Sequence, residues 1–212
     1  MKKSKWTQLR FRLMQKNRLQ QAFHKLYVKS GYMPNEAIFI VNHSGWWDAL
    51  VLFELEQKQQ IPPVYTMIDD AMLQQYPIFS KNGAFPVQLH DEEQALKAFQ
   101  YADLLLTEGK SIALFPQGTA THQEERPLQL APSVIRLFEL CRDIPIVPVS
   151  IYYTHRDVQK GEIWVALGDP IYNEPTRVLQ LDDMTKRLTE QLDALRLDAI
   201  DNNTHAYKNM LS

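Results

Sequence analysis

Short apolar runs alternate with longer amphipathic stretches along the chain. Apolar runs bounded by turn residues predict buried strands at 37–41, 64–68, 111–115, 146–152 and 162–167. Helical patterning and helix-end signals predict helices at 46–57, 91–108 and 131–141. Because strands and helices alternate, the sequence predicts an α/β fold: a single layered domain with a mixed, mostly parallel sheet flanked by helices.

Near the C-terminus, apolar residues recur at the spacing of one helix face. Such a stripe is typical of a helix that packs on a core, and far less typical of a cofactor-binding segment. Its members are Leu181, Met184, Leu188, Leu192 and Leu195.

The first thirty residues differ in charge from the rest. Residues 1–29 carry nine Lys or Arg and no Asp or Glu, although the formal net charge of the chain is −2. Apolar residues such as Trp6 and Phe11 are interleaved with these cations. The mixture predicts a basic amphipathic helix over 1–30 on an anionic membrane surface, ahead of a domain at 31–212. A helix packed on the domain and an RNA-contacting arm are the alternatives, and we expect no nucleic-acid partner.

Length and composition fit one folded domain, because a chain of 212 residues buries roughly 70 % of its unfolded surface. The single cysteine, Cys141, excludes an internal disulfide and a cysteine-based zinc site, which fits a reducing setting. No apolar run reaches the roughly 18 residues of a membrane-spanning helix. The expected location is therefore peripheral, on the cytoplasmic face of the cell membrane.

One histidine has an acid at a useful distance. His43 follows the predicted strand at 37–41, and Asp48 lies five residues later in the predicted helix at 46–57. None of the other five histidines has Asp or Glu at that distance. A carboxylate there can hold the imidazole in the tautomer that acts as a general base. Taken alone, the spacing also fits a helix-capping Asp beside a surface His.

Four short blocks give this pair a context. They are 42–48 (Asn-His-Ser-Gly-Trp-Trp-Asp), 83–87 (Gly-Ala-Phe-Pro-Val), 115–119 (Phe-Pro-Gln-Gly-Thr) and 146–149 (Ile-Val-Pro-Val). In order and spacing they resemble the lysophosphatidate (glycerolipid) acyltransferase family, over more than half of the chain. The resemblance implies a membrane-associated O-acyltransferase in which His43 is the general base and Asp48 orients it.

The resemblance also implies a substrate-binding set around the glycine turns, where backbone N–H groups can approach a ligand closely. The implied residues are Asn42, Gly83, Phe85, Gln88, Gln117, Gly118, Thr119 and Arg126. The acyl donor would be carried on coenzyme A or on acyl carrier protein, and the acceptor would be a lipid alcohol. No metal and no other cofactor are implied.

Four positions depart from the family pattern. Gln88 and Ala120 stand where the family usually has Arg, and Gln129 where it commonly has Lys. Gln117 replaces a usual Glu. The three missing cations are thought to bind the acceptor phosphate, and a hydrogen bond to a charged group is worth about 1.5–3 kcal/mol. We therefore expect a neutral or differently charged lipid acceptor, unless Arg126 replaces the missing cations.

A narrower resemblance points to glycosylated acceptors. The segments 115–118 and 126–128 look like those of a branch that acylates glycosylated carotenoids and related lipids. Glutamine and threonine side chains are suited to hydrogen bonds with sugar hydroxyls. The alternatives are a lysophosphatidate or lysophospholipid acyltransferase of phospholipid synthesis, a catalytically silent lipid-binding homologue, and a thioesterase.

Other polar clusters have simpler interpretations. His122, Glu124 and Glu125 are expected to form a solvated loop rather than a metal site. Tyr152 and Tyr153 are expected at a strand end rather than in a site. The sequence has no phosphate-binding Gly-Lys-Ser loop, Gly-x-Ser-x-Gly elbow or dinucleotide fingerprint.

Overall fold

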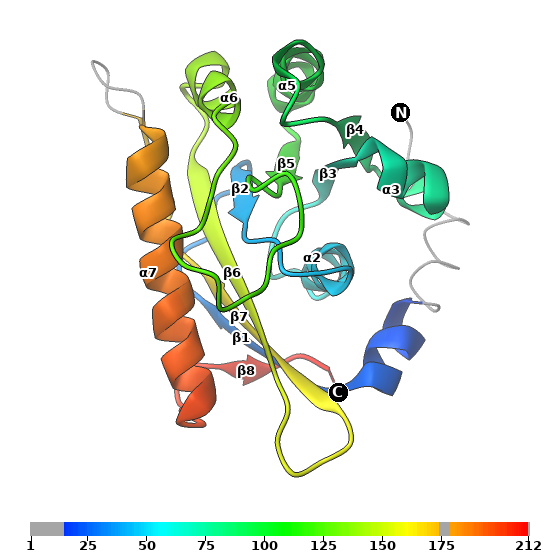
Figure 1. Ribbon diagram of the computed structural model, residues 1–212, viewed down its shortest axis with the longest axis vertical. Helices are drawn as coiled ribbons and strands as arrows, with labels where there is room; N and C mark the ends of the chain where they lie inside the picture. Colours follow the sequence, from blue (N-terminus) through cyan, green and yellow to red (C-terminus); the bar gives the residue numbers. More distant parts are fainter. Residues whose placement is uncertain (1–14, 174–178, 212) are drawn as a thin grey trace.

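The computed structural model describes residues 15–173 and 179–211, and within them one eight-stranded sheet carries helices on both faces (Figure 1). In spatial order the strands are β4 (Phe85–Val87), β3 (Val64–Asp69), β5 (Ser111–Leu114), β2 (Ile38–Val41), β6 (Ile146–Thr154), β7 (Gly161–Leu167), β1 (Phe23–Ser30) and β8 (Lys208–Asn209). In this order the first five strands, β4 to β6, are parallel, β6 and β7 are antiparallel, and β1 runs parallel to β7 and antiparallel to β8. The predicted mixed, mostly parallel sheet is therefore confirmed.

Helices cover both faces of the sheet and create two apolar clusters. One face carries α5 (Glu92–Thr107), α6 (Val134–Leu140) and α7 (Leu181–Ile200); the other carries α2 (Trp47–Gln57), α3 (Asp70–Gln75), α4 (Ile78–Lys81) and the helical residues 15–22. Ile38 and Ile40 pack in the first cluster and Phe39 and Val41 in the second, because successive strand side chains point to opposite faces. No helix in the described part of the chain is long and apolar enough to cross a membrane.

Apart from the N-terminal helix, the predicted elements are present, with ends displaced by three residues at most. In α7, Met184, Leu188, Leu192 and Leu195 are buried and Leu181 packs against the same core, so the predicted stripe faces inward. The elements without a prediction are short or irregular, and they are β4, β8, α3 and α4. A few residues show too little periodicity to separate a short element from a loop.

The N-terminal prediction is wrong for residues 23–30, which form β1 rather than the end of a helix. In the described part, the preceding helix ends at residue 22. Leu19, Phe23 and Leu26 are buried in the domain, so their apolar side chains contact the core and cannot contact lipid. β1 lies inside the sheet between β7 and β8, and residue 30 is therefore no domain boundary. Residues 1–14 of the predicted helix lie outside the described residues.

Candidate active site

Three neighbouring parallel strands end at one edge of the sheet, and polar residues follow each of them. Asn42 and His43 follow β2, the turn at 116–119 follows β5, and Tyr153 lies in the last residues of β6. Because parallel strands point the same way, these residues converge at the carboxyl edge, where α/β proteins usually bind ligands.

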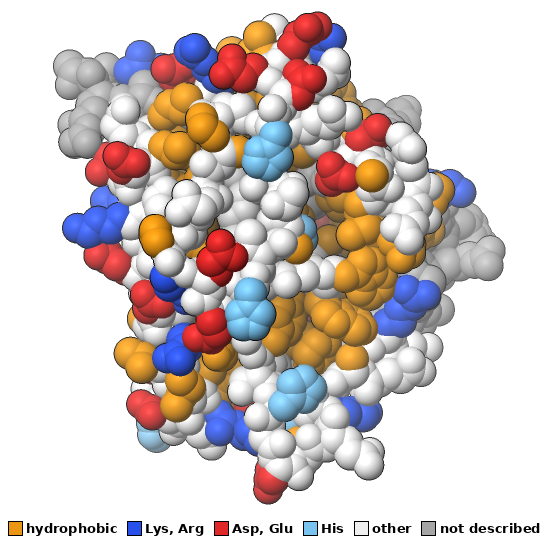
Figure 2. All heavy atoms as spheres, viewed as in Figure 1, with side chains coloured by type: hydrophobic (Ala, Val, Ile, Leu, Met, Phe, Trp, Pro, Cys, Tyr) orange, Lys and Arg blue, Asp and Glu red, His pale blue; other side chains and the backbone are white. Residues whose placement is uncertain are grey.

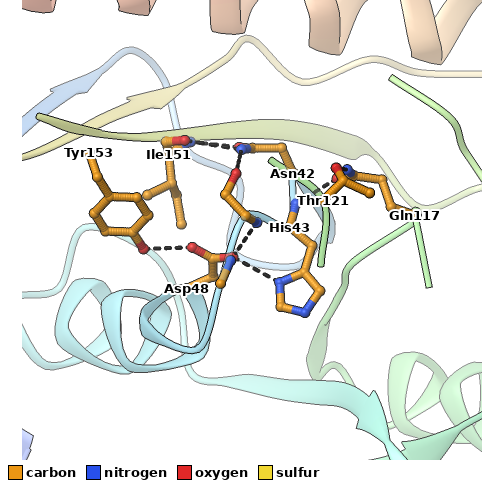
Figure 3. A network of polar contacts seen from close by, with 9 residues as sticks. Asn42, His43, Asp48, Gln117, Thr121, Ile151 and Tyr153 are labelled. Carbon is orange, nitrogen blue, oxygen red and sulfur yellow. Dashed lines mark hydrogen bonds and ion pairs between the residues drawn. The ribbon is translucent and has the colours of Figure 1, made fainter. Parts of the chain in front are cut away.

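His43 and Asp48 are in direct contact (Figure 3). His43 Nδ1 lies 2.8 Å from Asp48 Oδ2, and the backbone N–H groups of Ser44 and Gly45 donate to the same oxygen at 2.7 and 2.9 Å. The Asp48 side chain is fully buried, whereas that of His43 is 19 % exposed and stacks on Phe115. Since a carboxylate only accepts hydrogen bonds, we assign the proton to Nδ1, which leaves Nε2 as the basic nitrogen.

Tyr153 supplies a further donor to Asp48. It lies near a strand end, as predicted, but its hydroxyl also donates to Asp48 Oδ1 over 2.5 Å. Burial, the negative charge of Asp48 and this hydrogen bond raise the pKa of Tyr153 well above its usual value, so the hydroxyl keeps its proton at neutral pH. No local sequence signal marks the contact, because the two residues are 105 positions apart.

Asn42, which was expected to bind substrate, joins two strands instead. Its side-chain oxygen accepts from the backbone N–H of Ile151 at 2.7 Å, and its amide nitrogen donates to the carbonyl of Ile151 at 3.0 Å and to Ser44 Oγ at 3.1 Å. The side chain is buried. Asn42 therefore aligns the end of β2 with β6 and places His43 near Tyr153.

Gln117 also acts on the protein itself. Its side-chain oxygen accepts from the backbone N–H of His43 at 2.6 Å, and its amide nitrogen donates to Thr121 Oγ1 at 2.5 Å (Figure 3). The backbone N–H of Thr121 donates in turn to the carbonyl of His43 at 3.0 Å. With both ends of its buried amide occupied, Gln117 is placed to hold the backbone of His43 rather than a substrate.

The turn after β5 brings backbone groups to the site. Gly118 has a φ of +79°, and its N–H donates to the carbonyl of Phe115 at 3.1 Å. A Cβ on Gly118 would lie 2.7 Å from Nε2 of His90, so the glycine also permits a close approach of that ring. The backbone N–H groups of Thr119 and Ala120 donate to no acceptor among the described residues. These two groups, unlike that of Gly118, are therefore candidates for binding an oxyanion.

His43 opens onto an apolar cavity of about 340 Å³. Figure 2 shows apolar side chains gathered in a hollow over the region of α2 and α3. Asp69 is the only acidic residue in the described lining, which contains no Lys or Arg. The other lining residues are Gly45, Trp46, Ala49, Met67, Ile68, Met72, Phe79, Val87, Leu89, Phe115, Gly118, Thr119 and Ala120.

The second motif block borders a second cavity, of about 460 Å³. Phe85 and Gln88 line it from the β4 side, and Tyr101 lines it from α5. Val87 lines both cavities, which are therefore neighbours. Gly83, with a φ of +99°, belongs to the turn before β4 and lies outside the lining of both. The remaining lining residues of the second cavity are Asp70, Pro86, Gln94, Lys97 and Ala98.

Arg126 lies away from both cavities and is bound within the protein. Its Nε donates to Asp193 of α7 at 2.7 Å, and Nη1 donates to the carbonyls of Gln123 and Glu125, both at 2.8 Å. These contacts assign Arg126 a structural role. They leave its expected role at the acceptor, as a replacement for the missing cations, without support.

The polar loop at 122–125 is tied to the domain. Glu124 accepts hydrogen bonds from Tyr152 at 2.8 Å and from Arg196 at 2.6 Å. Burial alone would raise the pKa of Glu124, but these two hydrogen bonds and the positive charge of Arg196 outweigh it and lower the pKa. Glu124 therefore anchors the loop to β6 and α7.

The arrangement around His43 suits the transfer of an acyl group to a hydroxyl. A histidine oriented by a buried carboxylate removes a proton, free N–H groups stabilise an oxyanion, and an apolar cavity holds a chain. Asp48, which is itself bound by Tyr153, orients the imidazole, and the Gln117 network holds the backbone of His43.

Comparison with known proteins agrees with this arrangement. Residues 15–152 match the family model described as Acyltransferase. The fold is similar to the crystal structure of the 1-acyl-sn-glycerophosphate (LPA) acyltransferase PlsC from Thermotoga maritima, with a TM-score of 0.61, 13 % sequence identity, and coverage of 90 % of this chain and 79 % of that chain. A search of curated proteins returns no significant match. Because the family match spans more than half of the chain and contains both His43 and Asp48, the chain belongs to the acyltransferase family and is an acyltransferase.

Proposed function

We propose that this acyltransferase moves a fatty acyl group from a thioester to a hydroxyl of a lipid, with His43 as the general base. The observation that carries the proposal is the imidazole itself. Its Nδ1 is bound to Asp48, and the ring lines an apolar cavity that suits an acyl chain. The similar PlsC structure is named for a lipid substrate, 1-acyl-sn-glycerophosphate.

The reaction follows from the positions of these groups. His43 Nε2 takes the proton of the acceptor hydroxyl as that oxygen attacks the thioester carbonyl carbon. The N–H groups of Thr119 and Ala120 receive the resulting oxyanion. When the C–S bond breaks, the imidazolium returns the proton to the departing sulfur. Asp48 stabilises the imidazolium in between. No metal or other cofactor takes part in these steps.

The acceptor is proposed to be a neutral or glycosylated lipid alcohol, such as a glycosylated carotenoid. In the described lining of the cavity beside His43, Asp69 is the only acidic or basic side chain apart from the histidine, and an acid opposes a phosphate. Arg126 is bound to Asp193. The neighbouring cavity offers amides from Gln88 and Gln94 and the ring of Tyr101, a combination suited to sugar hydroxyls and to the apolar face of a sugar ring. Lys97, the one cation in the described lining of that cavity, is paired with Glu93 at 2.7 Å.

Lysophosphatidate is the second candidate acceptor, and two observations favour it. The similar PlsC structure is named for an acceptor of that kind. Arg18 places its guanidinium 5.6 Å from the ring centre of Trp46, a lining residue of the cavity, and so brings a cation close to the site. A phosphate held there would have at least one charged partner.

The protein is proposed to work at the cytoplasmic face of the cell membrane, where lipid acceptors are found. The five cations of residues 1–14 support this location, because each Lys or Arg near an anionic surface contributes about 1 kcal/mol. The acyl donor is proposed to be acyl-CoA or acyl carrier protein, both of which reach the membrane from solution.

The test is an acyl-transfer assay with the purified protein and a labelled long-chain acyl group on either carrier. Lysophosphatidate and a glycosylated lipid alcohol are offered in parallel, with His43→Ala as control. We expect label in the glycosylated lipid and a loss of roughly 10²–10⁴-fold in the His43→Ala protein, the usual contribution of a general base. A folded His43→Ala protein with full activity contradicts the mechanism.

Other outcomes select the alternatives. Label in phosphatidate identifies a phospholipid-forming enzyme. Release of free fatty acid without any acceptor product identifies a thioesterase. Binding of both lipids without turnover identifies a catalytically silent homologue.

A further inference from the structure

Tyr153 is held in place through both its backbone and its ring. Gln123 accepts from its backbone N–H at 3.0 Å and donates to its carbonyl at 2.9 Å, so one side chain satisfies both backbone groups. The tyrosine ring packs against Phe23 of β1, with ring centres 5.7 Å apart. The same loop that holds His43 through Gln117 therefore also holds Tyr153.

The hydroxyl of Tyr153 completes the hydrogen bonding of the Asp48 carboxylate. Oδ2 accepts hydrogen bonds from His43 and from two backbone N–H groups, whereas Oδ1 accepts one from the hydroxyl of Tyr153. A buried carboxylate is costly unless donors surround it. With a donor on each oxygen, rotation of the carboxylate about its χ2 bond is restricted, because a turn would break hydrogen bonds on both oxygens.

We propose that Tyr153 is a positioning residue of the His43–Asp48 pair, which sets the orientation of the carboxylate and the strength of its hydrogen bond to the imidazole. The inference rests on the proposed role of His43 as general base. Without the hydroxyl, the buried Oδ1 has no donor, the carboxylate turns more freely, and the imidazole spends less time aimed at the acceptor. The acyl and acceptor sites keep their shape, because the tyrosine acts through Asp48 and is absent from the lining of both cavities.

The chain offers a matched control in the adjacent residue. Tyr152 also donates to a carboxylate, Glu124, at 2.8 Å, but it packs with the cluster on the opposite face of the sheet. Tyr153→Phe and Tyr152→Phe therefore each remove one hydroxyl and one hydrogen bond to an acid from the same strand. In Tyr152→Phe, Glu124 keeps its hydrogen bond to Arg196 at 2.6 Å, so the loop at 122–125 stays anchored. A purely structural effect appears in both variants, whereas an effect on the catalytic pair appears only in Tyr153→Phe.

The experiment measures kcat and KM for both substrates, thermal unfolding, and the ¹⁵N resonances of the His43 imidazole in the full-length protein. We expect Tyr153→Phe to lower kcat by about tenfold, the scale of one lost hydrogen bond to a charged group, with KM within about twofold of wild type. The Nδ1 resonance of His43 changes in Tyr153→Phe and stays unchanged in Tyr152→Phe.

Three results overturn the inference: an unchanged kcat in Tyr153→Phe, equal losses of kcat in the two variants, or a loss confined to KM. If the wild-type protein transfers no acyl group, the proposed function fails. The ¹⁵N resonances of the His43 imidazole then decide whether Tyr153 positions the pair. An Nδ1 shift specific to Tyr153→Phe then still supports the positioning contact, and identical spectra in both variants refute it.

Discussion

Two glycines with left-handed backbone angles, Gly109 and Gly118, differ in what surrounds them. Gly109 has a φ of +69° and open space where a Cβ would be placed. Gly118 has a φ of +79°, and a Cβ there would meet the ring of His90 at 2.7 Å. The first glycine is required by backbone conformation alone, whereas the second is also required by the packing of the cavity wall.

The comparison predicts different costs for the same substitution. Gly109→Ala should lower the free energy of unfolding by about 1–2 kcal/mol, the cost of a left-handed residue with a side chain. Gly118→Ala should lower it further and also lower kcat/KM, because His90 and the turn that carries Thr119 must move. Urea unfolding and the acyl-transfer assay measure the two effects. Equal losses in both variants, with unchanged activity, would show that the contact with His90 is unimportant.

At the scale of elements, the segment between β5 and α6 organises the site. It supplies Gln117 and Thr121 to the backbone of His43, Gln123 to the backbone of Tyr153, and Arg126 to α7. Irregular segments cannot satisfy their own backbone groups, so they depend on such side-chain contacts. This segment therefore fixes the position of His43 relative to Tyr153 and α7.

Substitutions at Gln117 test whether this segment holds the backbone of His43 in place. Gln117→Glu keeps an acceptor for the backbone N–H of His43, and we expect activity within a few-fold of wild type. Gln117→Leu removes the acceptor and leaves that N–H unsatisfied, which costs about 1–3 kcal/mol and should lower both kcat and the melting temperature. Gln129→Leu, at an exposed position of the same segment, is the control and should change neither. Equal activity of the Leu and Glu variants at position 117 would remove Gln117 from the site.

At the scale of the whole molecule, the N-terminal segment belongs to the fold. Residues 15–22 pack against the domain through Leu19, and Gln15 donates to the carbonyl of Leu50 in α2 at 2.9 Å. β1 is then paired on both of its edges. A deletion of residues 1–29 would remove a strand from inside the sheet and would test folding rather than membrane binding.

A deletion of residues 1–14 separates the two questions. It removes five cations, Lys2, Lys3, Lys5, Arg10 and Arg12, and leaves the described fold complete. We expect the full-length protein to float with anionic liposomes at low salt and less well at high salt, because charge attraction is screened. The truncated protein should float poorly under both conditions while it unfolds at the same temperature. Unchanged flotation after truncation would contradict membrane binding through these cations.

The sequence by itself determined what depends on neighbours along the chain. The apolar runs located the central strands, because a strand buried on both faces must be apolar throughout. The spacing of His43 and Asp48 predicted their contact, because a strand end and the first turn of a helix bring residues five positions apart together.

Only the tertiary structure decided what depends on distant segments. β1 was interpreted as helix because its cations and apolar residues also fit a helical face, and its pairing with β7, more than 130 positions away, was required to make it a strand. The contact between Tyr153 and Asp48 and the inward-facing amides of Asn42 and Gln117 depend on the order of strands in the sheet. Side-chain direction at such positions is a property of the packed sheet, and no local pattern encodes it.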